Sequence, residues 1–354
     1  MREKRIIRNL FVGGGILLVS AGVLQFAARK IPGFGQWYAV TIYPWIVGIY
    51  GRICGLVPFS VVEMGLYGLV LFFVYSLLRR ERKWRKIFAG VFFTVDLLAF
   101  LYTANCGVNY YRKPFSSYLD LQVGKATTED LKALCQELVE KINETAPEEP
   151  VDMGLLAQGK LARTGKAAME KLGEEYPALS GCYPVPKPVM VSWILAVQQL
   201  CGVYSPFTVE ANYNWQMTGY NIPHTICHEL SHLRGFMRED EANFIGILAC
   251  TESDDAYFRY SGYLMAWVHA GNALAKADVE SFYELHSQLC GQAVQDLQEN
   301  NEYWDQYEGK VAEVSNQVND TYLKLNDQKD GVQSYGRVVD LMLAMFLQNR
   351  QEAQ

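Results

Sequence analysis

The sequence predicts a mainly helical α+β protein, in which about three membrane-spanning helices precede a water-soluble domain with a small sheet. Half of the 354 residues are hydrophobic, and they are concentrated in the first third of the chain. The rest has the composition of a soluble globular domain. We therefore expect a transmembrane anchor at residues 1–106 and a soluble domain at residues 107–354.

Three apolar stretches are long enough to cross a bilayer, which takes about 20 helical residues. They cover residues 10–28, 61–78 and 87–106. The basic sequences MREKRIIR, before the first stretch, and RRERKWRK, between the second and the third, should face the cytoplasm. An odd number of spans then places the residues after 106 outside the cytoplasm. The basic sequences and the number of spans thus predict a multi-pass protein of the cell membrane with a cytoplasmic N-terminus.

A fourth apolar stretch, residues 37–59, contains Pro44, Arg52 and Pro58 and is rich in Trp and Tyr. If it crossed the bilayer, the RRERKWRK sequence would lie outside, against the positive-inside rule. Because aromatic side chains favour the headgroup level, we expect an interfacial or re-entrant segment. The first span could instead be a cleaved signal peptide, but its apolar run is long for one, and we favour an anchor.

Charge and cysteine content argue against other classes of protein. The net charge of −6 does not suit a general nucleic-acid binder, whose domains carry basic surfaces. The 8 cysteines are scattered and form no Cys-x-x-Cys pair. Neither a zinc ribbon nor a thioredoxin-type pair is therefore expected.

In the soluble domain, sequence patterns place helices on both sides of one strand. Thr127 is a suitable N-cap for a helix at 128–143, because acidic residues follow in its first turn. Residues 207–213 alternate enough to form a strand, either at the edge of a sheet or within its core. A helix should begin near Pro223, a residue suited to a first helical position. Beyond residue 242 the chain is mostly helical, with an interruption around 326–331.

One short motif points to chemistry. Residues His228-Glu229-Leu230-Ser231-His232 match the pattern H-E-x-x-H. Residues four apart share a helical face, so both imidazoles can reach one ion. Zinc binds imidazole nitrogen, tolerates an open coordination position and lowers the pKa of a bound water. Glu229 is then placed to act as the general base.

A catalytic zinc site needs a third protein ligand, and a carboxylate from a second helix is the natural supplier. Gly235 can end the motif helix in a left-handed conformation. Glu239 follows and is our first choice as ligand, with Glu241 as the alternative. Asn243 shares a helical face with Glu239 and could hydrogen-bond a ligand imidazole. The same acidic residues could instead only complement the helix dipole.

The motif and the residues after it resemble those of the gluzincin metallopeptidases, in which H-E-x-x-H is followed by E-x-x-A-(D/N). This chain matches that pattern at Glu239, Ala242 and Asn243. The resemblance implies a zincin-like fold, peptide hydrolysis and one zinc ion held by His228, His232 and Glu239. Asn243 stands where many members have Asp, and the gap between His232 and Glu239 is short for the family.

Three longer stretches resemble a bacterial membrane family catalogued as domain of unknown function 3810. They are SPFTVEANYN at 205–214, HTICHELSHLRGFMREDEANF at 224–244 and VNDTYLKLNDQKDGVQSYGRVVDL at 318–341. With the N-terminal spans, the resemblance covers nearly the whole chain. It implies a zincin-like domain behind membrane helices and supplies no substrate, because the family is functionally uncharacterised.

Four further residues are candidates for contacts with the substrate or with the oxyanion that hydrolysis creates. They are Tyr322, Tyr335, Arg337 and, on the strand before the motif, Asn212. With 22 tyrosines in the chain, ordinary packing is the alternative for each tyrosine.

The other histidines are expected to be structural. His224 lies one turn before the motif and suits either a role at the start of the helix or a contact behind a ligand. His269 and His286 are distant along the chain.

These features predict a membrane-anchored zinc metalloendopeptidase that hydrolyses extracytoplasmic or membrane-proximal proteins. Its expected partners are the lipid bilayer, one zinc ion and a peptide or protein substrate. A catalytically inactive zincin-like sensor or scaffold is the first alternative, although a purely structural site has no need of Glu229. The second is an intramembrane protease, whose motif would lie within an apolar span, whereas polar and charged residues surround this one.

Overall fold

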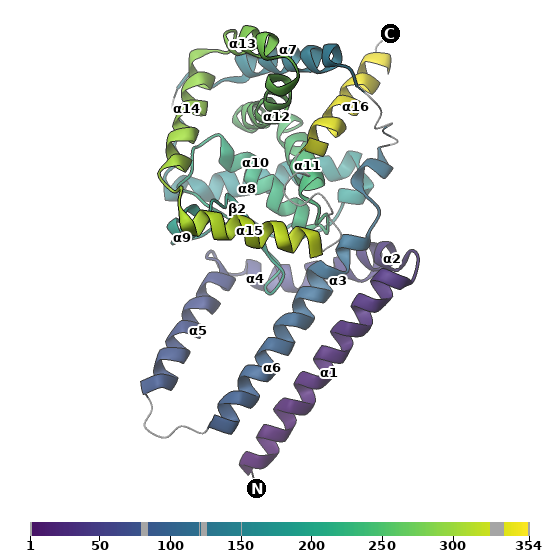
Figure 1. The fold of residues 1–354 in the computed structure, drawn as a ribbon, viewed down its shortest axis with the longest axis vertical. Helices are drawn as coiled ribbons and strands as arrows, with labels where there is room; N and C mark the ends of the chain where they lie inside the picture. Colours follow the sequence, from purple (N-terminus) through teal and green to yellow (C-terminus); the bar gives the residue numbers. More distant parts are fainter. Residues whose placement is uncertain are drawn as a thin grey trace. The chain divides into compact units, whose positions relative to one another are not determined.

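The chain is mainly helical, with a small three-stranded sheet, as the sequence predicts. Figure 1 shows the computed structural model, which describes residues 2–78, 84–119, 121, 126–149, 151–325 and 336–352. Contacts divide the chain into two compact units. Unit 1 comprises Met1–Lys113 with Ser205–Glu210, and unit 2 comprises Pro114–Tyr204 with Ala211–Gln354.

Unit 1 is built from long apolar helices and short connecting ones. Its helices are α1 (Arg2–Lys30), α2 (Phe34–Thr41), α3 (Tyr43–Ile46), α4 (Arg52–Gly55), α5 (Val61–Leu78) and α6 (Trp84–Tyr102), with π-helical turns at Val47–Gly51 and Thr103–Gly107 and a 3-10 turn at Asn109–Tyr111. α1 packs along α6, where the ring of Phe11 lies 6.0 Å from that of Phe88 and 5.2 Å from that of Phe92.

Among the described residues of unit 1, two helical segments are long and apolar enough to cross a membrane, Arg2–Lys30 and Trp84–Tyr111. They contain the first and third predicted spans and are compatible with membrane association. The second predicted span forms α5, whose apolar part, Val61–Ser76, is shorter than this criterion requires. The stretch at 37–59 folds into the end of α2, the short helices α3 and α4 and the π-helical turn between them.

A glutamate from the strand region caps α5. The two carboxylate oxygens of Glu210 accept hydrogen bonds of 3.1 Å from the main-chain N–H groups of Val61 and Val62. The first N–H groups of a helix lack partners within it, and a carboxylate also complements the positive end of the dipole. In the same unit, the side-chain amide of Asn105 donates to the carbonyl of Pro206 at 2.6 Å. These contacts explain why residues 205–210 belong to unit 1.

Unit 2 contains most of the helices and all of the sheet except Ser205 of β2 and Glu210 of β3, which belong to unit 1. Its helices are α7 (Thr128–Thr145), α8 (Leu155–Glu175), α9 (Trp193–Ala196), α10 (Asn221–Leu233), α11 (Glu239–Thr251), α12 (Ala256–Ala277), α13 (Val279–His286), α14 (Gly291–Asp305), α15 (Lys310–Leu325) and α16 (Gly336–Glu352), with 3-10 turns at Phe115–Tyr118 and Pro177–Leu179. The strands are β1 (Lys187–Pro188), β2 (Gly202–Ser205) and β3 (Glu210–Tyr213), in the order β1-β3-β2 with β1 parallel to β3.

α10 lies at the centre of the core of unit 2 and packs against α8, α11 and α12. Its apolar side chains recur at helical spacing and are fully buried: Ile222, Ile226, Leu230 and Leu233. On α8, Gly165 faces Ile226, and a Cβ at Gly165 would collide with that side chain. A glycine is therefore what allows these two helices to pack so closely.

Most predicted elements are confirmed, with adjusted bounds. α7 starts as predicted, with Thr127 and Asp130 in a reciprocal capping box. α10 begins at Asn221, slightly before Pro223. The strand predicted at 207–213 begins only at Glu210, because residues 206–209 form a turn. It is the central strand rather than an edge strand, since β1 and β2 flank it. The predicted interruption at 326–331 lies outside the described residues.

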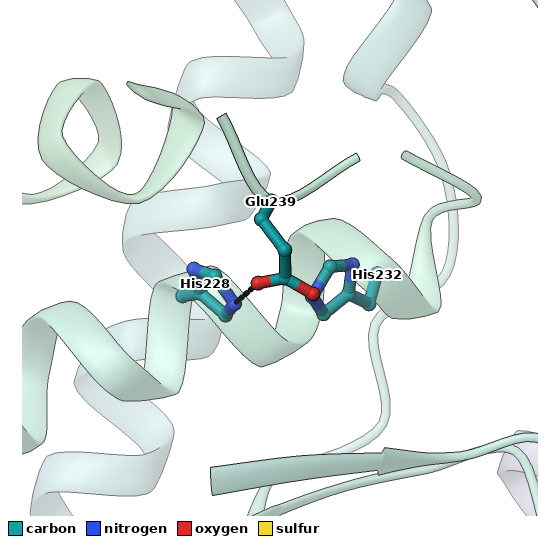
Figure 2. Close-up of side chains that lie close together, drawn as sticks. All are labelled: His228, His232 and Glu239. Carbon is teal, nitrogen blue, oxygen red and sulfur yellow. Dashed lines mark ion pairs between the residues drawn. The ribbon is translucent and has the colours of Figure 1, made fainter. Parts of the chain in front are cut away.

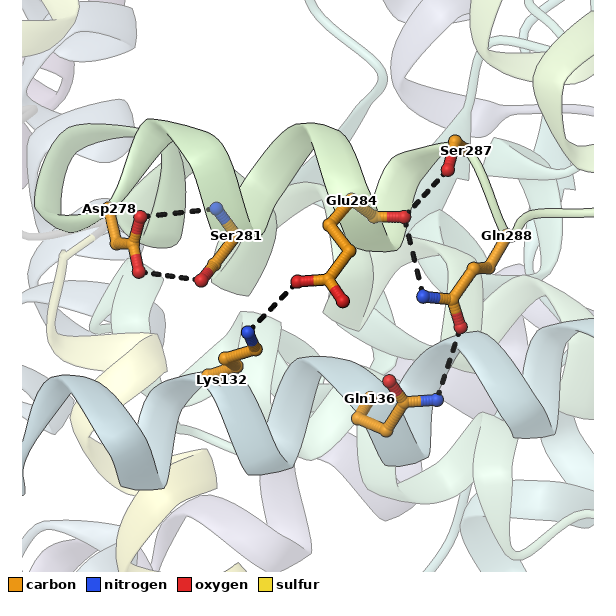
Figure 3. Close-up of polar contacts among 7 residues, drawn as sticks. All are labelled: Lys132, Gln136, Asp278, Ser281, Glu284, Ser287 and Gln288. Atoms are coloured by element: carbon orange, nitrogen blue, oxygen red, sulfur yellow. Dashed lines mark hydrogen bonds and ion pairs between the residues drawn. The ribbon is translucent and has the colours of Figure 1, made fainter.

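On the surface of unit 2, polar contacts connect α13 to α7 (Figure 3). Lys132 Nζ lies 3.0 Å from Glu284 Oε2. Asp278 caps α13 by accepting hydrogen bonds from the main-chain N–H and the hydroxyl of Ser281. An exposed ion pair such as Lys132–Glu284 contributes only about 0–1 kcal/mol to stability.

Candidate metal centre

The motif residues lie on α10, whose C-terminal end is shaped by Gly235. Gly235 has a φ of 95°, in the left-handed region that glycine adopts without strain. Its N–H donates to the carbonyl of His232 at 2.8 Å, and the N–H of Phe236 donates to that of Ser231 at 3.1 Å. After this turn α11 begins at Glu239 and packs against α10. The predicted glycine cap is therefore present.

Three side chains from these two helices converge, as Figure 2 shows. Nε2 of His228 lies 3.3 Å from Oε2 of Glu239, and Nε2 of His232 lies 3.5 Å from Oε1 of the same carboxylate. One potential ligand atom from each residue lies within 4.8 Å of the other two. In the part of the chain that the structure describes, no other group of histidine, cysteine or acidic side chains has this geometry. These three residues could hold a metal ion.

Glu239 and His232 shift each other's pKa. Burial alone would lower the pKa of His232, but the charge of Glu239 outweighs it and raises that pKa to about 9. Burial would likewise raise the pKa of Glu239, and the two imidazoles instead hold it well below its usual range. An ionised carboxylate between two imidazoles is a donor set that suits a divalent cation such as zinc.

The second ring nitrogen of His232 is also held in place. Its Nδ1 lies 2.8 Å from the carbonyl oxygen of Phe236, to which a protonated Nδ1 donates. Metal-binding histidines usually donate this second N–H to a carbonyl or a carboxylate, which fixes the tautomer and the ring orientation. The arrangement leaves Nε2 of His232, the atom that a metal ion would bind, directed towards Glu239.

Glu229 lies beside these residues and is buried against β2. The residue is 5% exposed, and its Oε2 has no hydrogen-bond partner among the described residues. Burial raises the pKa of Glu229, although the charges of His228 and His232 and a main-chain hydrogen bond from Tyr204 favour the ionised form. A Cβ on Gly202 would lie only 2.6 Å from Oε1 of Glu229. Glycine at this position therefore permits β2 to run directly against the candidate base.

The alternative ligand, Glu241, has other partners. Its Oε1 accepts a hydrogen bond of 3.0 Å from the main-chain N–H of Phe115 and lies 3.8 Å from a guanidinium nitrogen of Arg238. The ring of Phe115 packs edge-on against that of Phe236, with centroids 5.3 Å apart. Glu241 thus anchors the segment that contains Phe115, and Glu239 is the acidic residue that meets the two histidines.

Asn243 contacts a histidine of α10 through its main-chain carbonyl group and not through its side chain. Its carbonyl oxygen lies 3.3 Å from Nε2 of His224, the histidine one turn before His228. The rings of His224 and His228 are 6.1 Å apart. In the described structure the side chain of Asn243 makes no hydrogen bond to either ligand imidazole. The side chain of Asn243 therefore does not form the hydrogen bond to a ligand imidazole that we expected.

The candidates for substrate contacts lie in different places. Asn212 is fully buried on β3 and donates to a main-chain carbonyl of β2 at 3.4 Å, so it braces the two strands. Tyr322 lies on α15, and Tyr335 lies outside the described residues. Arg337 lies on α16. Burial raises the pKa of Asp240, the residue after Glu239, and the charge of Arg337 opposes this shift.

His269 of α12 lies within electrostatic range of His228, which its distance along the chain did not suggest. Burial and the charge of His228 lower the pKa of His269 to about 4. α12 packs against both α10 and α11, and this packing brings His269 near. No local spacing in the sequence signals such a contact, because His269 lies two helices after the motif. His286, in contrast, packs against the aromatic rings of Trp267 and Phe282.

Comparison with protein families finds that residues 38–343 match the family described as "Protein of unknown function (DUF3810)". Comparisons with curated proteins and with solved structures find no match. The family match covers well over half of the chain and includes all three residues of the candidate metal centre. The chain therefore belongs to the DUF3810 family, as the resemblance of its sequence predicted.

Proposed function

We propose that the protein is a membrane-anchored zinc metallopeptidase of the gluzincin type, which hydrolyses extracytoplasmic or membrane-proximal proteins. The observation that carries the proposal is the convergence of two imidazoles and a carboxylate beside the buried carboxylate of Glu229. Hydrolysis of a peptide bond needs both an electrophilic centre and a base. The placement outside the cytoplasm rests on the basic residues that flank the predicted spans.

His228, His232 and Glu239 would hold the zinc ion. Structural zinc sites use four protein ligands, most of them cysteine, whereas catalytic sites use three and keep one position open. None of the cysteines of the described chain belongs to this cluster. Zinc in such a site supplies Lewis acidity, which activates water and polarises the scissile carbonyl group.

Glu229 would act as the general base. Its carboxylate takes a proton from the attacking water and returns it to the nitrogen of the leaving amine. The elements of water are thereby added across the broken C–N bond. A carboxyl group whose pKa is raised by burial suits a step in which it must first accept a proton and then release it. Gly202 and Tyr204 of β2 keep this carboxylate in place.

The position of β2 favours a peptide as substrate. β2 lies at an edge of the sheet, and its first residue, Gly202, contacts Glu229. The outer side of an edge strand offers main-chain groups with which an extended peptide can pair. A polypeptide aligned in this way would pass close to the base.

Activity and zinc content together test the proposal. Full-length protein in detergent micelles, supplied with zinc, should hydrolyse fluorescently labelled casein, and a zinc chelator should abolish this activity. Glu229→Gln should retain zinc but lose about 10²- to 10⁴-fold in rate, the usual contribution of a general base. Glu280→Gln is the matched control, because Glu280 is an exposed glutamate on α13.

Two outcomes would contradict a peptidase. If Glu229→Gln cleaved casein as fast as the unaltered protein, the activity would not come from this site. If the protein bound zinc but cleaved neither casein nor a library of random peptides, the zincin-like sensor or scaffold would be the better account.

A further inference from the structure

Two cysteines on the helices of the candidate metal centre are in contact. Sγ of Cys227, on α10, lies 3.8 Å from Sγ of Cys250, on α11, although 23 residues separate the two along the chain. Both residues are fully buried. Cys227 directly precedes His228, and Cys250 lies on the helix that begins at Glu239. The two sulfurs therefore meet between the helix of the imidazoles and the helix of the carboxylate.

Neighbouring helices fix the positions of both cysteines. On α8, the carbonyl oxygen of Gly165 lies 4.0 Å from Sγ of Cys227. On α12, a Cβ at Gly262 would lie only 2.7 Å from the Cβ of Cys250. Both α8 and α12 pack against α10 and α11. The two thiols are therefore brought together where four helices meet, and their contact does not depend on a loop.

The gap between the two sulfurs is small enough for a covalent bond to close it. The S–S distance in a disulfide is about 2.05 Å, whereas 3.8 Å is van der Waals contact. Each sulfur swings about its own Cα–Cβ bond, so a shift of about 0.9 Å by each sulfur would bring them to bonding distance. Outside the cytoplasm, where disulfides form and persist, such a pair of thiols is readily oxidised.

We propose that Cys227 and Cys250 form a disulfide that joins α10 to α11. The inference rests on the placement of unit 2 outside the cytoplasm, which is part of the proposed function. The segment that the bond closes contains all three residues of the candidate metal centre: His228, His232 and Glu239. The bond therefore keeps the helix of the imidazoles against the helix of the carboxylate even when no metal is bound.

The oxidant is a disulfide donor, such as an oxidised thiol oxidoreductase or oxidised glutathione, and the bond forms in two exchange steps. The thiolate of one cysteine attacks a sulfur of the donor, and the donor's other sulfur leaves as a thiolate and takes up a proton. The thiolate of the second cysteine then attacks the mixed disulfide and releases the remaining donor sulfur in the same way. The two cysteines lose two protons and two electrons, which reduce the donor to two thiols. Because both cysteines are fully buried in the folded chain, these steps take place before α10 and α11 pack together.

Peptide mapping tests the bond directly. Full-length protein is purified from membranes without reductant, unfolded in the presence of iodoacetamide and digested. The expected product joins the peptide that contains Cys227 to the peptide that contains Cys250, and a thiol reductant separates the two. Cys135 is the internal control, because it is equally buried, on α7, and should be alkylated. If Cys227 and Cys250 are both alkylated in the sample without reductant, the inference is wrong.

Thermal unfolding in detergent separates the bond from packing. A disulfide restricts the unfolded chain, so Cys250→Ala should lower the unfolding temperature by about 5–10 °C. Cys135→Ala, which removes a buried thiol without a bond, should lower it by less. A thiol reductant present during unfolding should lower the unfolding temperature of the unaltered protein and leave that of Cys250→Ala unchanged. Equal effects of the reductant on these two proteins would contradict the bond.

The outcome for the disulfide is separable from that for the proposed function. If the joined peptides are found but the protein neither binds zinc nor cleaves casein, the disulfide stands and the peptidase fails. If cleavage of casein depends on zinc and both cysteines are alkylated, the peptidase stands and the disulfide fails.

Discussion

Gly202 lies so close to Glu229 that a Cβ on the glycine would be 2.6 Å from Oε1 of the carboxylate. The same Cβ would lie 2.8 Å from the side chain of Thr225. These distances are shorter than van der Waals contact, so no larger residue fits without moving either β2 or the carboxylate. The strand and the candidate base are therefore fixed relative to each other.

Gly202→Ala should reduce peptidase activity with little effect on metal binding. The added methyl group displaces Glu229, and a misplacement of about 1 Å at a reacting group can cost about 10²-fold in rate. The measurement is the rate of casein hydrolysis together with the zinc content. Gly291→Ala is the control, because a Cβ there meets no atom within 4 Å. Full activity in Gly202→Ala would show that the contact with β2 does not position the base.

Glu229→Gln should stabilise the metal-free protein at neutral pH. Burial raises the pKa of Glu229 in the folded state, so the folded state binds its proton more tightly than the unfolded chain. Stability therefore falls as the pH rises from the unfolded pKa of about 4.3 through the folded pKa, and the loss is complete above the latter. Removal of this buried charge should raise the free energy of unfolding by roughly 1–3 kcal/mol at pH 7.

The pH dependence provides the check on this prediction. Thermal unfolding of Glu229→Gln and of the unaltered protein should differ at about pH 7 and converge near about pH 4, where both states of the unaltered protein carry the proton. An equal or lower unfolding temperature for Glu229→Gln at pH 7 would contradict the prediction. It would mean that hydrogen bonds and nearby charges stabilise the ionised carboxylate of Glu229 enough to offset its burial.

Zinc affinity should rise with pH up to about pH 9. The charge of Glu239 raises the pKa of His232 to about 9, so below that pH a proton competes with the metal for this imidazole. Competition with a chelator at several pH values measures the effect. An apparent affinity that stays constant between about pH 6 and 9 would indicate that His232 is not a ligand.

Two glycines of α8 should respond in opposite directions to replacement by alanine. At Gly165 a Cβ collides with Ile226 of α10, so Gly165→Ala should destabilise unit 2 by about 1–3 kcal/mol. At Gly159 the nearest atom is the flexible end of Arg163, 3.7 Å away, and Gly159→Ala should stabilise the helix by about 0.5–1 kcal/mol. Thermal unfolding compares the two, and equal effects would contradict the close packing of α8 against α10.

The sequence was sufficient to predict the parts of the site that depend on local spacing. His228 and His232 are one helical turn apart, and Gly235 predicted where α10 ends. Glu239 was the first choice for the third residue of the cluster, and the structure brings it to the two histidines. All of these residues lie on two consecutive helices or in the short turn between them. Helical periodicity places the two histidines on one face, and the short turn keeps Glu239 close to them along the chain.

The contacts that the sequence did not predict all join residues that are distant along the chain. Gly202 meets Glu229 only because β2 lies against α10 at this point. The charge of His228 reaches His269 only because α12 packs against α10. Glu210 caps α5, which lies about 150 residues before it in the chain. Such contacts depend on tertiary packing, which cannot be predicted from the types and the local spacing of the residues.

The zinc content of the purified full-length protein, compared with that of His228→Ala, tests the central claim most directly. The account predicts one zinc ion per chain in the unaltered protein and its loss in His228→Ala, with the fold retained. A zinc-free unaltered protein that has been supplied with zinc, or a His228→Ala variant that keeps its zinc, would contradict it.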